Sequence, residues 1–219
     1  IQSITGWSIN ESIILIGIVT LIYTVFGGLR AIIHIDAFQF IVYLFSALIC
    51  IVFLFHYIDS SIPLTINYLY EAGKINTFDF SGNILTNPFT FISAFIGGAM
   101  LSFASHGSDY MMVQRVLATK NLNSAKKAMI GSGVFVLIQF LLFLFIGSLI
   151  YIVTDCVMID KDREITYVIK NILPIGFKGV VIAGVLSAAM STLSSSINAL
   201  SSSTLRDWMP KVKSMKISR

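Results

Sequence analysis

Polar residues, most of them serines, recur along one face of an apolar stretch near the end of the sequence. They are Ser187, Ser191, Ser194 or Ser195, and Asn198. Their spacing of three or four residues aligns them on one side of a helix. Within this stretch, Ala188, Ser191 and Thr192 place two hydroxyl oxygens next to one carbonyl oxygen. Small hard cations prefer such oxygen ligands, but serines that bond to the preceding turn of a packing face are the alternative.

A carboxylate lies in another apolar stretch. Asp36 follows Arg30 by about one and a half helical turns, and Gln39 lies on the same face at i+3. A charged side chain at the centre of a membrane helix costs about 2.5 to 3.5 kcal/mol on insertion scales, and such residues usually face a bundle interior or an aqueous path. The pair suits a cation pathway or gate, and an interfacial acid paired with Arg30 or water is the alternative.

Small and polar residues interrupt a third apolar stretch. They are Gly97, Gly98, Ser102, Ser105, His106, Gly107, Ser108 and Asp109. They predict a broken helix, because non-helical backbone at membrane depth is tolerated only around a cavity, and transporters place substrate sites at such breaks. Close helix packing would also explain the small residues. His106 suits a proton carrier or a structural histidine equally, and no partner at metal-ligand spacing accompanies it.

The composition shows which elements must position these residues. The chain has 219 residues, of which 56% are hydrophobic and 12% charged, and its mean hydropathy is +0.85. These values exclude an ordinary soluble domain. Five stretches are long enough to cross a hydrocarbon layer of about 30 Å. We therefore expect an all-α integral membrane protein with one partial transmembrane domain over residues 1–219 and helices at approximately residues 12–29, 31–58, 88–113, 128–154 and 177–205.

The charges predict the orientation of these helices. Ten of the fifteen Lys and Arg residues lie on one side, namely Arg30, Arg115, Lys120, Lys126, Lys127, Arg206, Lys211, Lys213, Lys216 and Arg219. The opposite loops hold five basic and eight acidic residues. Because basic residues collect on the cytoplasmic side, the first helix should start outside and the last should end inside. Each basic cluster adjoins an apolar stretch, so the clusters do not indicate nucleic-acid binding.

The ends of the sequence and its two cysteines are also informative. The chain begins with Ile1, has no signal-peptide pattern and ends in a basic segment, so we expect a piece of a longer protein. Cys50 falls within a helix and Cys156 in a loop, a pattern that predicts neither a metal site nor a disulfide framework. The stretch over residues 62–80 suits an external loop with a short interfacial helix.

Three motifs, in this order, strongly resemble the sodium:solute symporter family. They are YTVFGGLRAIIHIDAFQ at residues 23–39, GSDYMMVQRVLATK at residues 107–120 and KGVVIAGVLSAAMSTLSSSIN at residues 178–198. The resemblance covers nearly the whole chain. It implies the fold of the bacterial leucine transporter, with two inverted five-helix repeats, and it places the expected helices as core helices four to eight.

The resemblance also implies site residues. The family's sodium site would lie at the Ala188 carbonyl and at the hydroxyls of Ser191 and Thr192, with further ligands from core helix one, which this chain lacks. Asp36 would match a carboxylate near the route of the ion to the cytoplasm, with Gln39 beside it. The substrate cavity would include Ser102, Ser105, His106 and Asp109. Because Ser102 and Ser105 stand where sugar transporters carry asparagine and tyrosine, a galactose-like site is in doubt.

Together these observations predict sodium-coupled symport of a small organic solute by alternating access across the cytoplasmic or plasma membrane. The partners would be sodium, a solute of the sugar, amino acid, sialic acid or carboxylate type, and membrane lipid, with no cofactor beyond the coupling ion and no nucleic acid. A membrane sensor domain of a signalling protein, such as a sensor kinase, is the alternative. An intramembrane enzyme is a weaker one, because no pair of acids, Ser-His arrangement or metal cluster is evident.

Overall fold

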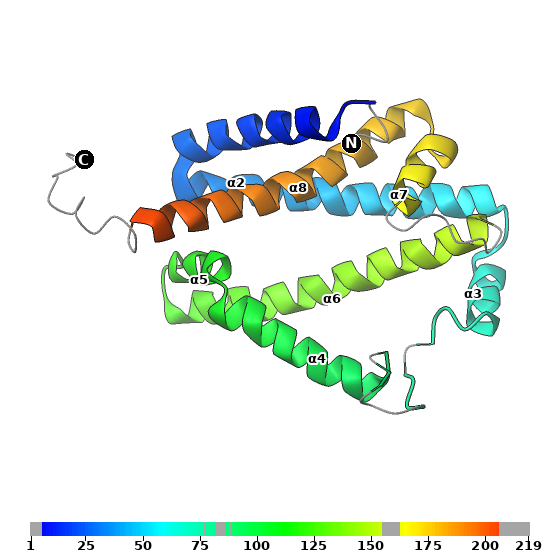
Figure 1. The fold of residues 1–219 in the computed structure, drawn as a ribbon. Coiled ribbons are helices and arrows are strands. Elements are labelled where there is room, and N and C mark those ends of the chain that lie inside the picture. Colours follow the sequence, from blue (N-terminus) through cyan, green and yellow to red (C-terminus); the bar gives the residue numbers. More distant parts are fainter. Residues whose placement is uncertain (1–5, 77, 82–85, 88, 155–162, 206–219) are drawn as a thin grey trace, which may run out of the picture. The chain divides into compact units, whose positions relative to one another are not determined.

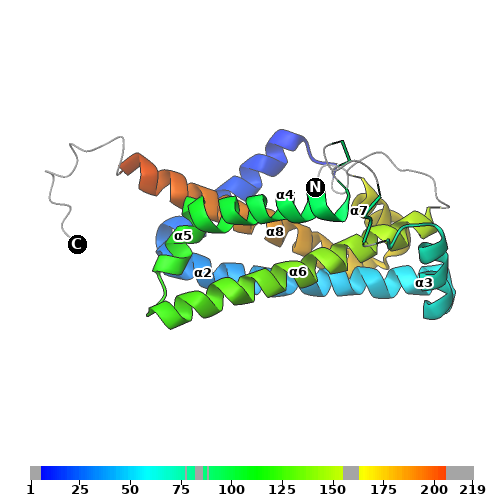
Figure 2. The ribbon, with the colours of Figure 1, turned by 90° about the horizontal axis from the view of Figure 1, so that it is seen from below.

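The computed structural model describes residues 6–76, 78–81, 86–87, 89–154 and 163–205. Its helices are α2 (Ile9–Ile58), α3 (Ile62–Glu71), α4 (Phe91–Phe103), the π-helical turn η1 (Ala104–Ser108), α5 (Tyr110–Leu117), α6 (Leu122–Val153), α7 (Glu164–Tyr167), the π-helical turn η2 (Val168–Ile172) and α8 (Ile175–Ser203) (Figures 1 and 2). The described residues contain no β-strand. The predicted all-α class is therefore confirmed for them.

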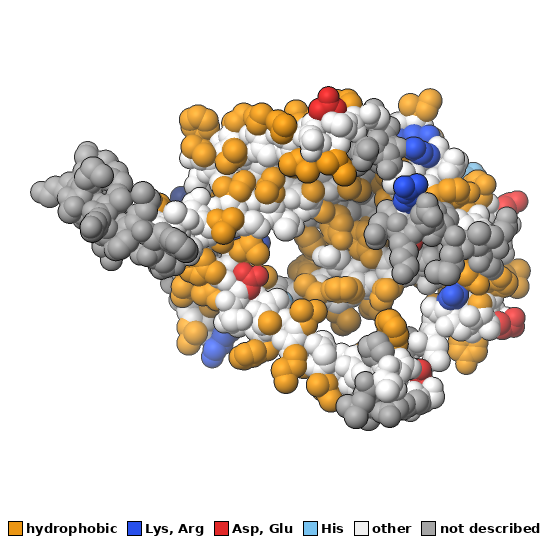
Figure 3. Space-filling view, viewed as in Figure 1, with side chains coloured by type: hydrophobic (Ala, Val, Ile, Leu, Met, Phe, Trp, Pro, Cys, Tyr) orange, Lys and Arg blue, Asp and Glu red, His pale blue; other side chains and the backbone are white. Residues whose placement is uncertain are grey.

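Three of these helices, α2, α6 and α8, are long and apolar enough to cross a membrane. Large apolar side chains lie on their surfaces, including Phe26 on α2, Leu144 on α6 and Leu200 on α8. Figure 3 shows apolar side chains scattered over the face in view. Such extensive apolar exposure is expected where side chains meet lipid or further membrane helices rather than water.

Helix α2 is divided by Gly28, which has non-helical dihedral angles (φ 59°, ψ −170°). The chain reverses direction within α2 (Figure 1), which gives a first arm over residues 9–27 and a second arm over residues 29–58. A positive φ strains residues with a Cβ atom, so glycine is favoured at this position. The sequence predicts a boundary at Arg30, and the structure places it at the nearby Gly28, because a glycine adopts this conformation without strain.

The segment over about residues 88–113, expected as one interrupted helix, is divided into α4, η1 and α5 in the structure. The first part, α4, has 13 residues, about 20 Å of helix, which is too short to cross the hydrocarbon layer alone. Its helical path continues through η1 and stops at Asp109, which has an extended conformation (φ −68°, ψ 117°). The expected break therefore occurs at Asp109, whereas Gly97 and Gly98 lie within regular helix.

The other helices differ from the sequence-based bounds at their ends. Helix α6 begins at Leu122, not at residue 128, because the Asn121 side chain accepts a hydrogen bond from the Ser124 amide at 2.8 Å and so caps the helix. Helix α8 begins directly after Pro174 and ends at Ser203, two residues before the predicted end. The short helix expected in the loop is present as α3. The C-terminal basic residues and residues 155–162 lie outside the described part of the chain.

The chain forms two compact units, which we describe separately. Unit 1 comprises Ile1–Ser46 and Gly179–Arg219, and unit 2 comprises Ala47–Lys178. Unit 2 contains aromatic contacts between Phe53 and Phe177, with ring centroids 4.8 Å apart, and a contact of Lys74 with the Tyr151 ring at 4.1 Å. The second arm and η2 contribute buried apolar residues to this unit.

In unit 1, Ser46 and Gly184 allow the second arm to approach α8 closely. The Ser46 hydroxyl lies 2.7 Å from the Val42 carbonyl oxygen and 3.0 Å from the Val180 carbonyl oxygen. A Cβ atom added at Gly184 would overlap the Ser46 side chain. Close approach of two helices at a small residue is the usual means of packing in membranes, where the hydrophobic effect does not drive association.

We expect Gly184→Ala to destabilise the full-length protein by about 1 to 3 kcal/mol, because the new methyl group overpacks this contact. The measurement is thermal unfolding of the purified protein in detergent. Gly179→Ala on the same helix is the matched control, since a Cβ atom there meets nothing within 4 Å. Equal unfolding temperatures for the two variants would contradict the close packing at Gly184.

Candidate functional site

The predicted cation ligands lie within little more than one turn of α8. The Thr192 hydroxyl donates a hydrogen bond to the Ala188 carbonyl oxygen at 3.2 Å. The Ser191 side chain is partly buried, and its hydroxyl bonds to no described residue. The turn therefore holds two hydroxyl oxygens and one carbonyl oxygen close together, each with lone pairs that are not all used. Three neutral oxygens of this kind could form part of a sodium site.

The serines that follow bond to the preceding turn of α8. The Ser194 and Ser195 hydroxyls both donate to the Ser191 carbonyl oxygen, at 3.0 and 2.9 Å. The Ser196 hydroxyl donates to the Thr192 carbonyl oxygen at 2.9 Å. These are the contacts expected of serines on a packing face, and they also concentrate oxygen atoms around Ser191. A packing face and a cation site, the two interpretations that the sequence left open, are thus compatible in this structure.

The Asp36 carboxylate lies against α8 within unit 1. Its side chain is only 9% exposed, and the Ser194 hydroxyl, which is fully buried, approaches Asp36 Oδ1 at 3.4 Å. The same hydroxyl approaches the Ser191 carbonyl oxygen, so its single proton is shared between two acceptors. The structure therefore connects the predicted pathway carboxylate to the predicted cation motif through one side chain, Ser194.

Gln39 shares the buried face of Asp36, as its i+3 spacing predicts. Its side chain is 7% exposed, and Oε1 has no hydrogen-bond partner among the described residues. The hydroxyls of Thr20 and Thr24, on the first arm of α2, are also buried without a described partner. Sequence reasoning missed these threonines, although their i, i+4 spacing in an apolar helix is a detectable signal. Unit 1 therefore contains buried hydrogen-bonding atoms for which its described residues provide no partner.

Tyr23 is another contributor that sequence reasoning missed. Its hydroxyl donates to the Met190 carbonyl oxygen at 3.2 Å, next to Ser191 in the chain. This bond attaches the first arm of α2 to the turn of α8 that carries the predicted cation ligands. Nothing in the spacing of the sequence indicates that Tyr23 and Met190 meet, because they lie on different helices.

In unit 2, His106 is held between two serines. Its Nδ1 atom lies 2.8 Å from the Ser105 hydroxyl, and its Nε2 atom lies 3.1 Å from the Ser132 hydroxyl on α6. Ser105 also donates to the Ser102 carbonyl oxygen at 3.2 Å. Three of the four predicted cavity residues are therefore joined by hydrogen bonds, and Ser132 is an additional member that the sequence did not reveal.

Asp109, the fourth predicted cavity residue, has a clear local role. Its carboxylate accepts a hydrogen bond from the Met111 amide at 2.9 Å and caps the start of α5. Its own amide donates to the Ala104 carbonyl oxygen at 3.1 Å. Asp109 therefore ends one helical segment and begins the next, which explains why the chain resumes a helix directly after the break.

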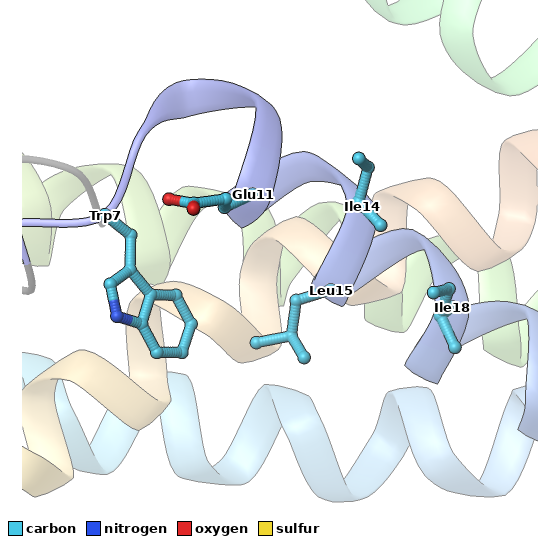
Figure 4. Close-up of a pocket in the computed structure, with 5 residues that line it drawn as sticks. All are labelled: Trp7, Glu11, Ile14, Leu15 and Ile18. Carbon is cyan, nitrogen blue, oxygen red and sulfur yellow. The ribbon is translucent and has the colours of Figure 1, made fainter.

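A shallow groove lies elsewhere in unit 1, at the start of α2, and is lined by Trp7, Glu11, Ile14, Leu15 and Ile18 (Figure 4). Its one carboxylate, that of Glu11, accepts hydrogen bonds from the Ser8 amide at 2.8 Å and the Ser8 hydroxyl at 2.9 Å. Glu11 thus completes a capping box at the helix start. The groove is otherwise apolar and has none of the oxygen ligands found on α8.

Comparisons with known proteins connect these features to a family. The family model described as the sodium:solute symporter family matches residues 1–217. The putative sodium-dependent multivitamin transporter of Drosophila melanogaster is 26% identical over 95% of this chain and 36% of its own length. Human sodium-coupled monocarboxylate transporter 1 is 27% identical over 94% of this chain and 35% of its own length. Rat sodium/glucose cotransporter 2 is 30% identical over 94% of this chain and 36% of its own length.

The chain thus spans about a third of the length of these relatives. No solved structure matches it. The relatives are named as transporters or cotransporters and not as enzymes, and the family consists of integral membrane proteins. The family match covers nearly every residue and includes all three motifs that suggested the resemblance. This chain belongs to the sodium:solute symporter family.

Proposed function

We propose that this chain is the central part of a symporter that uses a sodium gradient to move a small organic solute across the cytoplasmic or plasma membrane. In this proposal five segments span the membrane: the two arms of α2, the interrupted segment from α4 to α5, α6 and α8. They would correspond to core helices four to eight of an inverted-repeat transporter. The remaining sodium ligands would come from core helix one, outside this chain.

The observation that carries this proposal is the connection from Asp36 through Ser194 to Ser191. A carboxylate attracts a cation, while hydroxyl and carbonyl oxygens can replace part of its hydration shell. With both kinds of ligand side by side in unit 1, a sodium ion that leaves Ala188, Ser191 and Thr192 would meet Ser194 and then Asp36. The unpaired oxygen of Gln39 would provide a further ligand along this route.

Coupling would follow from the order of these events. Sodium and solute would bind together in the outward-facing state, because the ion stabilises the arrangement of helices that forms the solute cavity. Release of sodium along the Asp36 route would then weaken the cavity and free the solute on the inside. The chain would need no covalent chemistry and no cofactor besides the coupling ion.

The solute would be a small organic molecule that contacts the interrupted segment near Ser102 and Ser105, with His106 and Asp109 nearby. Relatives described above are named for glucose, monocarboxylates and vitamins, so the class of solute is broad within the family. None of those relatives is named as a signalling protein, and the sensor alternative therefore has no support from them.

Thr192→Ala in the full-length protein should raise the sodium concentration for half-maximal uptake by about tenfold, as expected if one oxygen ligand contributes about 1.4 kcal/mol. Thr192→Ser keeps the hydroxyl and should have little effect. Ser196→Ala is the matched control, since the Ser196 hydroxyl donates to the Thr192 backbone carbonyl oxygen, which is not one of the proposed sodium ligands. The measurement is sodium-dependent uptake in proteoliposomes. Unchanged sodium dependence in Thr192→Ala would remove Thr192 from the ion site.

Asp36→Asn and Ser194→Ala separate charge from hydrogen bonding. The Asn side chain can still accept the hydrogen bond from Ser194 but no longer attracts a cation, so we expect uptake to slow by about tenfold or more while the protein still inserts and folds. Ser194→Ala keeps the charge and should slow uptake less. Uptake rates and the yield of folded protein are measured together. Parental kinetics in Asp36→Asn would place this carboxylate outside the ion route.

Gln39→Leu tests whether the unpaired oxygen of Gln39 serves transport or only packing. Leucine removes a buried oxygen that lacks a partner, so the free energy of unfolding should stay the same or rise by up to about 1 kcal/mol. Sodium-driven uptake should fall several-fold. Opposite changes in the two measurements are the expected signature. A less stable variant with normal uptake per folded molecule would show that Gln39 is a structural residue.

A further inference from the structure

The hydrogen bonds around His106 have only one neutral arrangement that satisfies all of them. A carbonyl oxygen can only accept, so the 3.2 Å contact with the Ser102 carbonyl oxygen is made only when Ser105 directs its single proton there. The 2.8 Å contact between Ser105 and His106 Nδ1 therefore requires the proton on Nδ1. With Nδ1 protonated, Nε2 of a neutral ring is an acceptor, so Ser132 must donate to it across the 3.1 Å contact. Each group therefore donates to the next one: Ser132 donates to His106, His106 donates to Ser105, and Ser105 donates to the Ser102 carbonyl oxygen.

These hydrogen bonds join η1 to α6 within unit 2, close to the break in the helix at Asp109. His106 lies in η1, where the regular helix of α4 gives way to the break at Asp109, and Ser132 lies on α6. π-Helical turns inside longer helices are frequent at functional sites. Among the described residues, the Ser132 hydroxyl bonds only to His106, so its proton is not used by the preceding turn of α6.

We propose that His106 is a positioning residue whose Nδ1–H, held in place by Ser132, orients the Ser105 oxygen toward the solute as a hydrogen-bond acceptor. This inference rests on the proposed function, in which Ser105 faces the solute. It assigns His106 a role different from direct solute contact, since both of its ring nitrogens are already engaged. It also adds Ser132, on another helix, to the residues that determine specificity.

The arrangement defines the chemistry of the solute at this point. The Ser105 proton is used by Ser102, and one of its lone pairs is used by His106, so one lone pair is left for the solute. That lone pair accepts a hydrogen bond and cannot donate one. The solute must therefore present a donor here, such as a hydroxyl or an N–H group, and an analogue with a carbonyl or ether oxygen at that point should be disfavoured.

The first test examines the ring itself in the full-length protein, without sodium or solute. Solid-state ¹⁵N NMR of histidine-labelled protein in liposomes reports which ring nitrogen carries the proton, and loss of the signal in His106→Gln assigns it. We expect the neutral Nδ1–H form in the parent and in Ser132→Thr, which keeps the hydroxyl. In Ser132→Ala the Nε2–H form should gain population, because Nε2 loses its donor and can then donate to water.

Ser148→Ala is the matched control, since this partly exposed serine of α6 bonds to the Leu144 carbonyl oxygen at 3.1 Å and not to a histidine. Its spectrum should match that of the parent. An Nε2–H or doubly protonated His106 in the parent, or an unchanged spectrum in Ser132→Ala, would overturn the proposed hydrogen-bond order from Ser132 through His106 to Ser105. This result does not depend on whether the protein transports anything.

The second test measures solute selectivity with pairs that differ in one donor. L-lactate and pyruvate are such a pair, and D-glucose and 3-O-methylglucose are another. For a pair in which a sodium gradient drives uptake, we expect the parent to prefer the donor-bearing member, and Ser132→Ala to reduce that preference about fivefold through KM, while Ser132→Thr retains it. A preference for the member without the donor, or equal preference in the parent and Ser132→Ala, would overturn the role of His106.

The two tests separate failure of this inference from failure of the proposed function. If no pair shows sodium-driven uptake, the proposed transport of these solutes and the selectivity built on it both fail, even when NMR supports the proposed hydrogen-bond order. If uptake is sodium-driven but the preference does not change in Ser132→Ala, transport stands and the positioning role of His106 is wrong.

Discussion

A polar group inside an apolar medium must find a partner, and in unit 1 the arrangement of the helices follows from this requirement. Asp36 is buried with Ser194 beside it, and Tyr23 and Ser46 each donate to a carbonyl oxygen of α8. In lipid or in a protein interior, an unpaired charge or hydrogen-bonding group costs several kcal/mol. These contacts therefore select one relative placement of the two arms and α8 over others that would bury the same apolar area.

The same contacts show why a packing face and an ion site need not be alternatives. A hydroxyl that donates its proton to the preceding turn keeps its lone pairs, and these can still coordinate a cation. Thr192 is bonded to the Ala188 carbonyl oxygen in this way, and both oxygens retain acceptor capacity. Back-bonding holds these oxygens in place, so the proposed sodium site would need little reorganisation to bind an ion.

Breaks in the helices are made by two different means. Gly28 adopts a positive φ and reverses the chain within α2, a conformation that glycine reaches without strain. Asp109 instead takes an ordinary extended conformation and uses its carboxylate to begin α5. The first device requires a residue without a Cβ atom, whereas the second requires a capping side chain. Gly97 and Gly98 looked like breaking residues but remain helical, because glycine permits a break without causing one.

The sequence by itself determined the properties that depend on neighbours along the chain. Hydropathy predicted the apolar helices, three of which are long enough to span a membrane, the i+3 spacing predicted the shared buried face of Asp36 and Gln39, and three motifs identified the family. Tertiary structure alone decided that Ser194 contacts Asp36, that Tyr23 contacts Met190 and that Ser132 holds His106. The physical reason is that helical periodicity fixes which residues share a face, whereas the partner opposite that face depends on the packing of segments far apart in the chain.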